Sequence, residues 1–427
     1  MDSESLLNTN EINIVRGKYQ IEDVCRKIVN NYRNMDELFG VMDLSEVVRR
    51  FLRLKEIMPR VEQFYAMKCN PNENICKVLA AVGCNFECAS THEINRLLNL
   101  NIDQDRIIFA NPSKPVSQVE YVAKHQVMKM VFDSEMELHK IHEIFPNAEL
   151  VLRFRCDAKK ADFMLGEKYG CNPVLDAPRL LKLAKELQLN VIGVSFHVGC
   201  GCKEPEVYGR AIKFARDIFN SALEIGFSMN FLDIGGGFPG HSSVDVKPIT
   251  DIVNSALSTY FPEDNVRIIS EFGQYYVTAA CTLTSCILGK RKIQDEITTE
   301  KIMYFINDSV MRNFIISLCD VYVPTPRPLF LNSASTKQYK STIWGCTMES
   351  KDKIHDNILL PELNCADYII FENMGAYSQS CESIFCGYSK TLVYTIVDEF
   401  TYEMIKNHEI FKTNSNLVEF KLNNLFN

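Results

Sequence analysis

Lys68 is the first residue whose surroundings indicate chemistry. The apolar segment 64–67, with the sequence FYAM, precedes it, and NPN at 70–72 follows with the residues of a turn. This pattern predicts a buried strand with Lys68 at its carboxyl end. A lysine held against apolar side chains has a lowered pKa and can attack an aldehyde as a free amine. Because most lysines near strand ends only extend into water, Lys68 alone does not define a site.

Three further segments carry groups that would complement such an amine. Gly235, Gly236 and Gly237 are consecutive, and without Cβ atoms their N–H groups can approach an anion such as a phosphate. His197 and Glu271 each end an apolar segment, with a flat titratable ring and a carboxylate. Alone, each feature has an ordinary structural explanation, such as a tight turn, a core histidine or an ion pair. Together they supply the groups that pyridoxal phosphate needs.

Apolar, strand-like segments recur along the chain, and helix-like segments fill nearly every gap between them. They span 64–68, 85–89, 107–110, 130–132, 150–154, 191–197, 231–235 and 268–271. Eight buried strands alternating with helices predict an α/β fold with a closed (β/α)8 TIM barrel, whose catalytic groups lie at the carboxyl ends of the strands. An open, doubly wound sheet is the alternative that the same alternation allows.

The pattern changes after residue 275, where strand-like segments are joined by turns. We therefore expect a barrel domain of residues 37–278. A second, mostly β and β-sandwich-like domain would combine residues 279–427 with the N-terminal segment 1–36.

Composition narrows the class of protein. The chain has 427 residues, 46% of them hydrophobic, and a net charge of −8. An acidic chain is a poor partner for nucleic acid or an anionic membrane, and no apolar segment has membrane-spanning length. The sixteen cysteines are scattered among apolar residues, as expected of reduced thiols in a cytoplasmic protein. Their spacing fits no metal site.

The motifs FYAMKCN, FECAS, IIFANP, GVSFHVG, LDIGGGFPG and FENMGAY together resemble eukaryotic ornithine decarboxylase, and insect members especially, over residues 38–397. That family belongs to the group IV pyridoxal-phosphate decarboxylases, with an alanine-racemase-like barrel. The resemblance implies a homodimer that converts ornithine to putrescine in polyamine biosynthesis. Each site would combine one subunit's barrel with the partner's β domain, so that residues 344–352 face the partner's site.

The resemblance also implies residue roles. Lys68 would form a Schiff base with the cofactor, His197 would stack on its ring and Glu271 would pair with the ring nitrogen. Other implied cofactor residues are Glu87, Glu93, Arg153, Cys200, Gly235, Gly236, Gly237, Gly273, Gln274 and Tyr377. Implied substrate residues are Cys319, Asp320 and Glu349.

Several of these positions depart from the family pattern. Gln274 replaces an arginine that binds the phosphate, and Met348 replaces a catalytic cysteine that returns a proton to the substrate. Arg312 and Cys346 are candidates to compensate for these two losses. Smaller departures replace a serine with Cys200, a tyrosine with Cys319, and two aspartates with Glu87 and Glu349.

Two classes of function follow from this mixture. The first is a decarboxylase of ornithine or of another amino acid. The second is a catalytically impaired relative that acts by binding, as antizyme inhibitors do by occupying antizyme. The segment matching the family's antizyme contact, residues 114–140, keeps several lysines.

Overall fold

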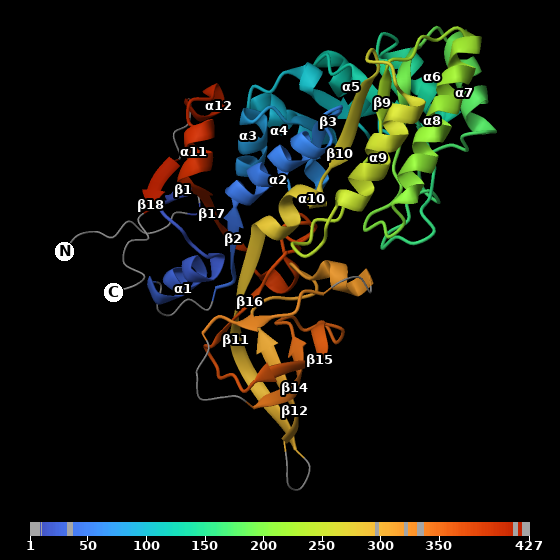
Figure 1. The fold of residues 1–427 in the computed structure, drawn as a ribbon. Helices are drawn as coiled ribbons and strands as arrows, with labels where there is room; N and C mark the ends of the chain where they lie inside the picture. Colours follow the sequence, from blue (N-terminus) through green and yellow to red (C-terminus); the bar gives the residue numbers. More distant parts are fainter. Residues whose placement is uncertain are drawn as a thin grey trace. The chain divides into compact units, whose positions relative to one another are not determined.

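The computed structural model describes residues 9, 11–31, 37–294, 299–319, 323–330, 337–412 and 417–420 (Figure 1). The chain forms two compact units. One is Arg49–Tyr276, and the other combines Met1–Val48 with Val277–Asn427. Among the described helices, none is long and apolar enough to cross a lipid bilayer.

The unit Arg49–Tyr276 is a closed barrel of eight parallel strands in the order β10-β3-β4-β5-β6-β7-β8-β9. The strands are β3 Val61–Ala66, β4 Asn85–Cys88, β5 Ile107–Phe109, β6 Lys129–Phe132, β7 Glu149–Phe154, β8 Asn190–Phe196, β9 Phe231–Asp233 and β10 Arg267–Phe272. The predicted (β/α)8 barrel is confirmed, and the open sheet is wrong because β10 pairs with β3 and closes the ring.

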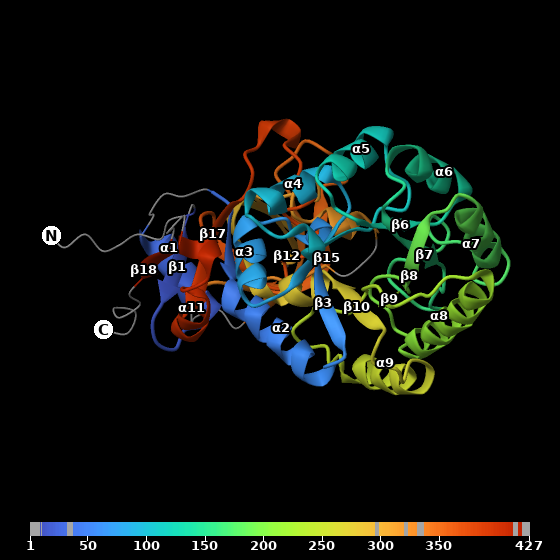
Figure 2. The same ribbon diagram turned by 90° about the horizontal axis from the view of Figure 1, so that it is seen from above.

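Helices follow the barrel strands and lie around the outside of the ring, where Figure 2 shows them. They are α3 Glu73–Ala81, α4 Thr91–Asn99, α5 Val116–Lys124, α6 Glu135–Ile144, α7 Asp176–Glu186, α8 Glu206–Ile225 and α9 Lys247–Tyr260. The helix α2 Leu44–Ile57 precedes β3 and lies outside the ring as well, and the short α10 Gln274–Val277 follows β10. Local sequence sets their ends. The Ser90 side chain caps α4 by accepting from the Glu93 N–H, and Gly226 ends α8 in the left-handed conformation.

Side chains inside the barrel form layers, because alternate residues of a strand face the same side. The middle layer is apolar and contains Phe64, Ile108, Val131, Val151, Phe231 and Ile269. Two residues toward the amino ends of these strands stand Glu62, Lys129, Glu149 and Arg267. Two residues toward the carboxyl ends stand Arg153, Asp233 and Glu271. An apolar layer therefore separates polar groups at the two ends of the barrel.

The other unit is mostly β, as predicted. Ten strands among its described residues form one branched sheet, in the order β15-β14-β12-β11-β2-β17-β1-β18 with β16 beside β11 and β13 beside β16. The strands are β1 Ile12–Val15, β2 Phe39–Asp43, β11 Cys281–Gln294, β12 Thr299–Ile306, β13 Arg327–Pro328, β14 Gln338–Trp344, β15 Lys353–Pro361, β16 Tyr368–Phe371, β17 Leu392–Asp398 and β18 Leu417–Phe420. The α-helices in the described part of this unit are α1 Ile21–Asn31, α11 Glu399–Ile405 and α12 Glu409–Lys412. The N-terminal strands belong here because β1 and β2 both pair with β17.

Candidate active site

The carboxyl end of the barrel gathers the predicted residues from five separate strands. Glu87 lies on β4, Arg153 on β7 and Glu271 on β10, while His197 directly follows β8. Lys68 differs from the prediction. Strand β3 ends at Ala66, and Lys68 lies one turn further on, in the short 3-10 helix η1 Met67–Cys69. All five side chains nevertheless reach the same end of one closed ring.

Lys68 forms an ion pair with Glu87 at this end of the barrel. The Glu87 side chain is 1% exposed, whereas that of Lys68 is 40% exposed. Burial lowers the pKa of Lys68, but the carboxylates of Glu87, Glu271 and Glu93 outweigh burial and raise that pKa above its usual value. The expected lowered pKa is therefore wrong, because acidic rather than apolar side chains surround the amine.

His197 is held as a neutral ring. Burial, with the nearby charges of Arg153 and Lys68, lowers the pKa of His197 well below its usual value. The Gly199 N–H donates to His197 Nδ1 at 3.1 Å, which leaves the ring proton on Nε2. A neutral, oriented imidazole suits stacking on a flat aromatic group.

Glu271 has a second carboxyl group beside it, which the sequence analysis did not assign a role. Asp233, at the end of β9, contacts Glu271 through its side chain and accepts from the Gly235 N–H at 2.8 Å. Asp233 is 1% exposed and Glu271 8%. The sequence held one indication of this role. Asp233 comes just before the three glycines, and it lies two residues after Phe231, so it faces the inside of the barrel.

The glycines after β9 pack so closely that larger residues would not fit. A Cβ on Gly235, whose φ is +65°, would lie 2.1 Å from the Phe196 carbonyl oxygen. A Cβ on Gly237, whose φ is +92°, would lie 2.1 Å from the Gly199 carbonyl oxygen. The structure gives the buried N–H groups of Gly236 and Gly237 no partner among the described residues. Free N–H groups on a close-packed loop are suited to an anion.

Gln274 lies against this loop as a neutral donor. Its Nε2 donates to the Phe238 carbonyl oxygen at 3.1 Å and more weakly to that of Gly237 at 3.5 Å. Gly273, just before it, allows close packing against η1, because a Cβ there would lie 3.0 Å from Cys69 Cβ. The loop thus carries no cationic side chain at position 274.

Two more predicted residues border the same end of the barrel. Cys200 forms an antiparallel bridge with Phe163, and burial raises the pKa of its thiol. The Arg153 guanidinium lies over the Tyr169 ring, with 5.1 Å between Cζ and the ring centroid. The Cys200 bridge joins the segment after β7 to the segment after β8, whereas the Arg153 contact holds the segment after β7 against β7 itself.

The remaining predicted residues belong to the β unit. Tyr377 has a φ of +52°, a conformation that is unusual for a bulky residue and often marks a functional turn. Met348 is 91% exposed, and Glu349 Oε1 accepts from the Lys351 N–H at 3.1 Å. Cys319 ends the short helix η4 Ile315–Cys319. Its side chain and all of Asp320 lie outside the described part of the chain.

Asp352 organises the loop that carries Met348. It is 1% exposed and accepts from the Val310 N–H, the Thr347 N–H and the Ser309 hydroxyl, each at 2.9 Å. The Asp352 carboxylate is therefore used inside its own unit, and the expectation that residues 344–352 face a partner's site stays a prediction.

Arg312 is also committed within the β unit. It is 4% exposed, and its guanidinium donates to Glu382 at 3.0 Å and to the carbonyl oxygens of Asn307 and Ser389. These bonds count against Arg312 as a replacement for the family's phosphate-binding arginine. Burial raises the pKa of the Cys346 thiol, so that thiol keeps its proton at neutral pH.

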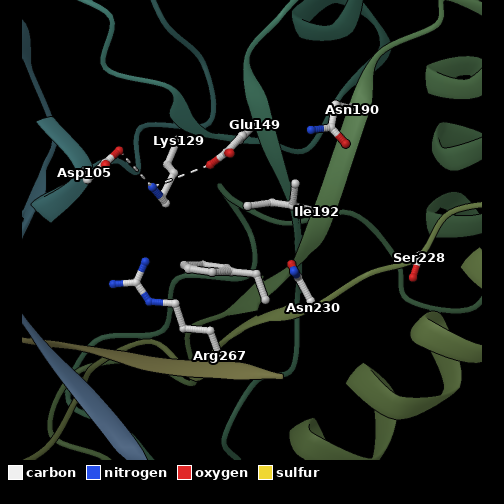
Figure 3. Close-up of a pocket in the computed structure, with 9 residues that line it drawn as sticks. Asp105, Lys129, Glu149, Asn190, Ile192, Ser228, Asn230 and Arg267 are labelled. Atoms are coloured by element: carbon white, nitrogen blue, oxygen red, sulfur yellow. Dashed lines mark ion pairs between the residues drawn. The ribbon is translucent and has the colours of Figure 1, made fainter. Parts of the chain in front are cut away.

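A hollow of about 600 Å³ lies at the opposite end of the barrel (Figure 3). Three of its charged lining residues pair, since Lys129 Nζ lies 3.5 Å from Glu149 and 3.9 Å from Asp105. The fourth, Arg267, pairs with Glu62 at 2.7 Å. The apolar layer separates this hollow from Lys68. The hollow is therefore not part of the candidate active site.

The carboxyl end of the barrel defines a class of protein, a barrel suited to bind pyridoxal phosphate. Free loop N–H groups match a phosphate, a neutral ring can cover the pyridine, and a carboxyl and an amine complete the match. The residues present therefore fit the group.

Comparison with known proteins identifies the family. Residues 44–278 match the model of the pyridoxal-dependent decarboxylases, pyridoxal binding domain. The chain belongs to this family of pyridoxal-dependent decarboxylases, together with ornithine decarboxylases.

Individual relatives cover nearly the whole chain. Ornithine decarboxylase of Mus musculus is 40% identical over 408 residues, 91% of this chain and 87% of the mouse protein. Antizyme inhibitor 2 of Xenopus laevis is 37% identical over 417 residues, 94% of this chain and 91% of the frog protein. The structure of Paramecium bursaria Chlorella virus arginine decarboxylase bound to agmatine has a TM-score of 0.84 at 34% identity, covering 88% of this chain and 100% of the viral one.

Proposed function

We propose that this protein is a pyridoxal-phosphate-dependent decarboxylase that converts ornithine to putrescine. The observation that carries the proposal is the meeting of Lys68, His197 and Glu271 at the carboxyl end of one barrel, beside a glycine loop with free N–H groups. Family membership and the ornithine decarboxylases among the relatives support this substrate and reaction.

Each residue has a task that its surroundings support. Lys68 holds the cofactor covalently through its amine, and Glu87 keeps a negative charge beside that nitrogen. The neutral His197 ring covers one face of the pyridine, while Glu271 supplies the carboxylate for the ring nitrogen. When bound, pyridoxal phosphate withdraws electrons from the bond that breaks as carbon dioxide leaves.

Binding of the phosphate and of the substrate extends the proposal to other residues. The N–H groups of Gly236 and Gly237, with Tyr377, hold the phosphate. The carboxylates of Asp320 and Glu349, beside Cys319, receive the distal ammonium of the amino acid. A homodimer brings the loop of residues 344–352 to the partner's barrel, which is supported by the exposed Met348 at its tip.

A cytosolic location is part of the same proposal. Every cysteine whose side chain the structure describes is free of disulfides. Reduced thiols are the rule in the cytosol and rare in secreted proteins.

The visible absorption of the purified protein with pyridoxal phosphate tests the assignment, before and after borohydride reduction. A reducible band is expected, and reduction should attach the cofactor to Lys68. Lys68→Ala should abolish the band, whereas Lys124→Ala, which alters an exposed lysine on α5, should leave it intact. A band that survives in Lys68→Ala would sink the assignment. A panel of ornithine, lysine and arginine, followed by carbon dioxide release, then identifies the substrate.

A second candidate function is binding to antizyme without catalysis. The neutral Gln274 and the thioether of Met348, which has no proton to donate, favour it. The lysines of residues 114–140 support it less than the sequence suggested. Lys114 is buried and pairs with Glu137 at 2.8 Å.

Other lysines of that segment are also used internally. Lys140 pairs with the same Glu137 carboxylate, and Lys129 is 8% exposed and lies near Glu149. Lys124 alone among the segment's lysines is classed as exposed. Gel filtration with purified antizyme separates the two functions. A complex formed by a protein that releases no carbon dioxide from any amino acid of the panel would favour the second candidate.

A further inference from the structure

We propose that Asp233 is a positioning residue that joins the glycine loop to Glu271. Its Oδ1 accepts a hydrogen bond from the loop, and its Oδ2, which keeps its proton, donates a hydrogen bond to the Glu271 carboxylate. The inference rests on the proposed function, because Glu271 is the group that faces the cofactor's ring nitrogen there. Asp233 is the second residue of the motif LDIGGGFPG, but none of the implied residue roles included it.

Asp233 first holds the loop that would bind the phosphate. Its Oδ1 accepts from the Gly235 N–H at 2.8 Å. The carbonyl oxygen of the same Gly235 accepts from the Glu271 N–H at 2.8 Å and from the Ser270 hydroxyl at 2.5 Å. Gly235 is thus hydrogen-bonded on both sides, which joins β9, the loop and β10.

The second oxygen of Asp233 is in an unusual position. Asp233 Oδ2 is buried, and no hydrogen-bond donor reaches it from the described residues. The Asp233 side chain instead contacts that of Glu271. Two buried carboxylates in contact repel each other strongly, so such a pair holds a proton between them.

The charges around the pair decide which carboxyl group holds this proton. Burial, followed by the negative charges of Glu271 and Glu87, raises the pKa of Asp233 well above its usual value. Burial and Glu87 also raise the pKa of Glu271, but the cations Lys68 and Arg153 and the hydrogen bond from Asp233 oppose that rise.

We therefore assign the proton to Asp233, because the largest influences on its pKa include no cation, whereas Lys68 and Arg153 favour the ionised form of Glu271. His197, the remaining titratable group on a neighbouring strand end, is neutral and adds no charge.

This arrangement prepares Glu271 for its proposed partner. By donating to one oxygen of Glu271, Asp233 stabilises the ionised form and orients the carboxylate. The same side chain sets the loop, so the phosphate position and the ring-nitrogen position are linked. Asp233 therefore positions both the glycine loop and the Glu271 carboxylate, whereas an ordinary turn residue would only shape the loop.

Infrared spectroscopy of the cofactor-free protein tests the position of the proton. The difference spectrum between wild type and Asp233→Asn, recorded at pH 9, is expected to contain the carbonyl stretch of one protonated carboxylic acid. Asp308→Asn is the matched control. Burial raises the pKa of Asp308 to about 7, so its acid is ionised at pH 9 and its difference spectrum should lack that stretch. Absence of the stretch from the Asp233→Asn difference would overturn the proposal.

Cofactor affinity tests the positioning role. Asp233→Val removes both hydrogen bonds at similar volume and should weaken pyridoxal-phosphate binding about 10- to 100-fold. Asp233→Asn keeps an acceptor for Gly235 and a permanent donor for Glu271, so it should recover most of that loss. Equal weakening in both variants would refute the role. If wild type binds no pyridoxal phosphate, the proposed function fails, while the infrared result still decides where the proton lies.

Discussion

Placing a cation at position 274 is the sharpest test of the departure that the family resemblance implies there. Gln274 lies against the glycine loop, where its Nε2 donates to the Phe238 carbonyl oxygen at 3.1 Å. A guanidinium at the same position keeps a donor for that carbonyl and adds a positive charge beside the free N–H groups of Gly236 and Gly237. Gln274→Arg should therefore bind the cofactor's phosphate more tightly.

The expected gain follows from the kind of bond that is added. A hydrogen bond to a charged group contributes about 1.5–3 kcal/mol, which corresponds to roughly a 10- to 150-fold lower dissociation constant. Arg50 places a guanidinium near this loop already, donating to the Gly240 carbonyl oxygen at 2.9 Å and to that of Tyr275 at 2.7 Å. Because the Arg50 guanidinium donates to these carbonyl oxygens, we do not expect it to bind the phosphate.

Titration of the apoprotein with pyridoxal phosphate, followed by absorption or by quenching of Trp344, measures the change. Gln274→Met removes the donor without adding charge, and Gln274→Glu reverses the charge. The affinity should fall in the order Arg, Gln, Met, Glu at this position. The advantage of arginine should shrink as salt is raised, because salt screens charge.

Equal dissociation constants for Gln274 and Gln274→Arg would refute this reasoning. Another cation would then already contact the phosphate. Arg50 would be the first candidate to examine, since Arg312 is 4% exposed and bound to Glu382.

Three further predictions concern other parts of the site. Glu87→Gln removes the main charge that raises the pKa of Lys68. Attachment of the cofactor needs the neutral amine, so the pH at which the attachment rate is half-maximal should fall by about 1–3 pH units. An unchanged pH profile would count against the ion pair. Met348→Cys adds a thiol proton at an exposed position, so any aldehyde formed from the substrate should decrease in favour of the amine, as product analysis can measure. Asp352→Ala leaves the N–H groups of Val310 and Thr347 without their acceptor, so the free energy of unfolding should fall by about 2–4 kcal/mol. The control Asp356→Ala, on the exposed face of β15, should change the free energy of unfolding by less than about 1 kcal/mol. Denaturant titrations measure both values.

The sequence by itself predicted the architecture, which the structure confirms, and most residues of the candidate site, whose roles stay predictions. Alternation of apolar segments with helical ones predicted the barrel, because strands buried on both faces are apolar almost throughout. The ends of those segments identified His197 and Glu271, since a parallel barrel brings all carboxyl ends together. Lys68 was also found, although its strand ends two residues earlier, at Ala66.

Only the tertiary structure decided the charges on these groups and the uses of their neighbours. The pKa of Lys68 depends on Glu87 and Glu271, which come from β4 and β10, and no local pattern records that meeting. The burial of Lys114 likewise follows from its pairing with Glu137, 23 residues away. Asp233 had no predicted role, and only the pairing of β9 with β10 in the folded barrel places it against Glu271. The pattern of apolar residues in the sequence predicts which segments are buried. Electrostatic energies, however, depend on distances between strands, which only the folded barrel sets.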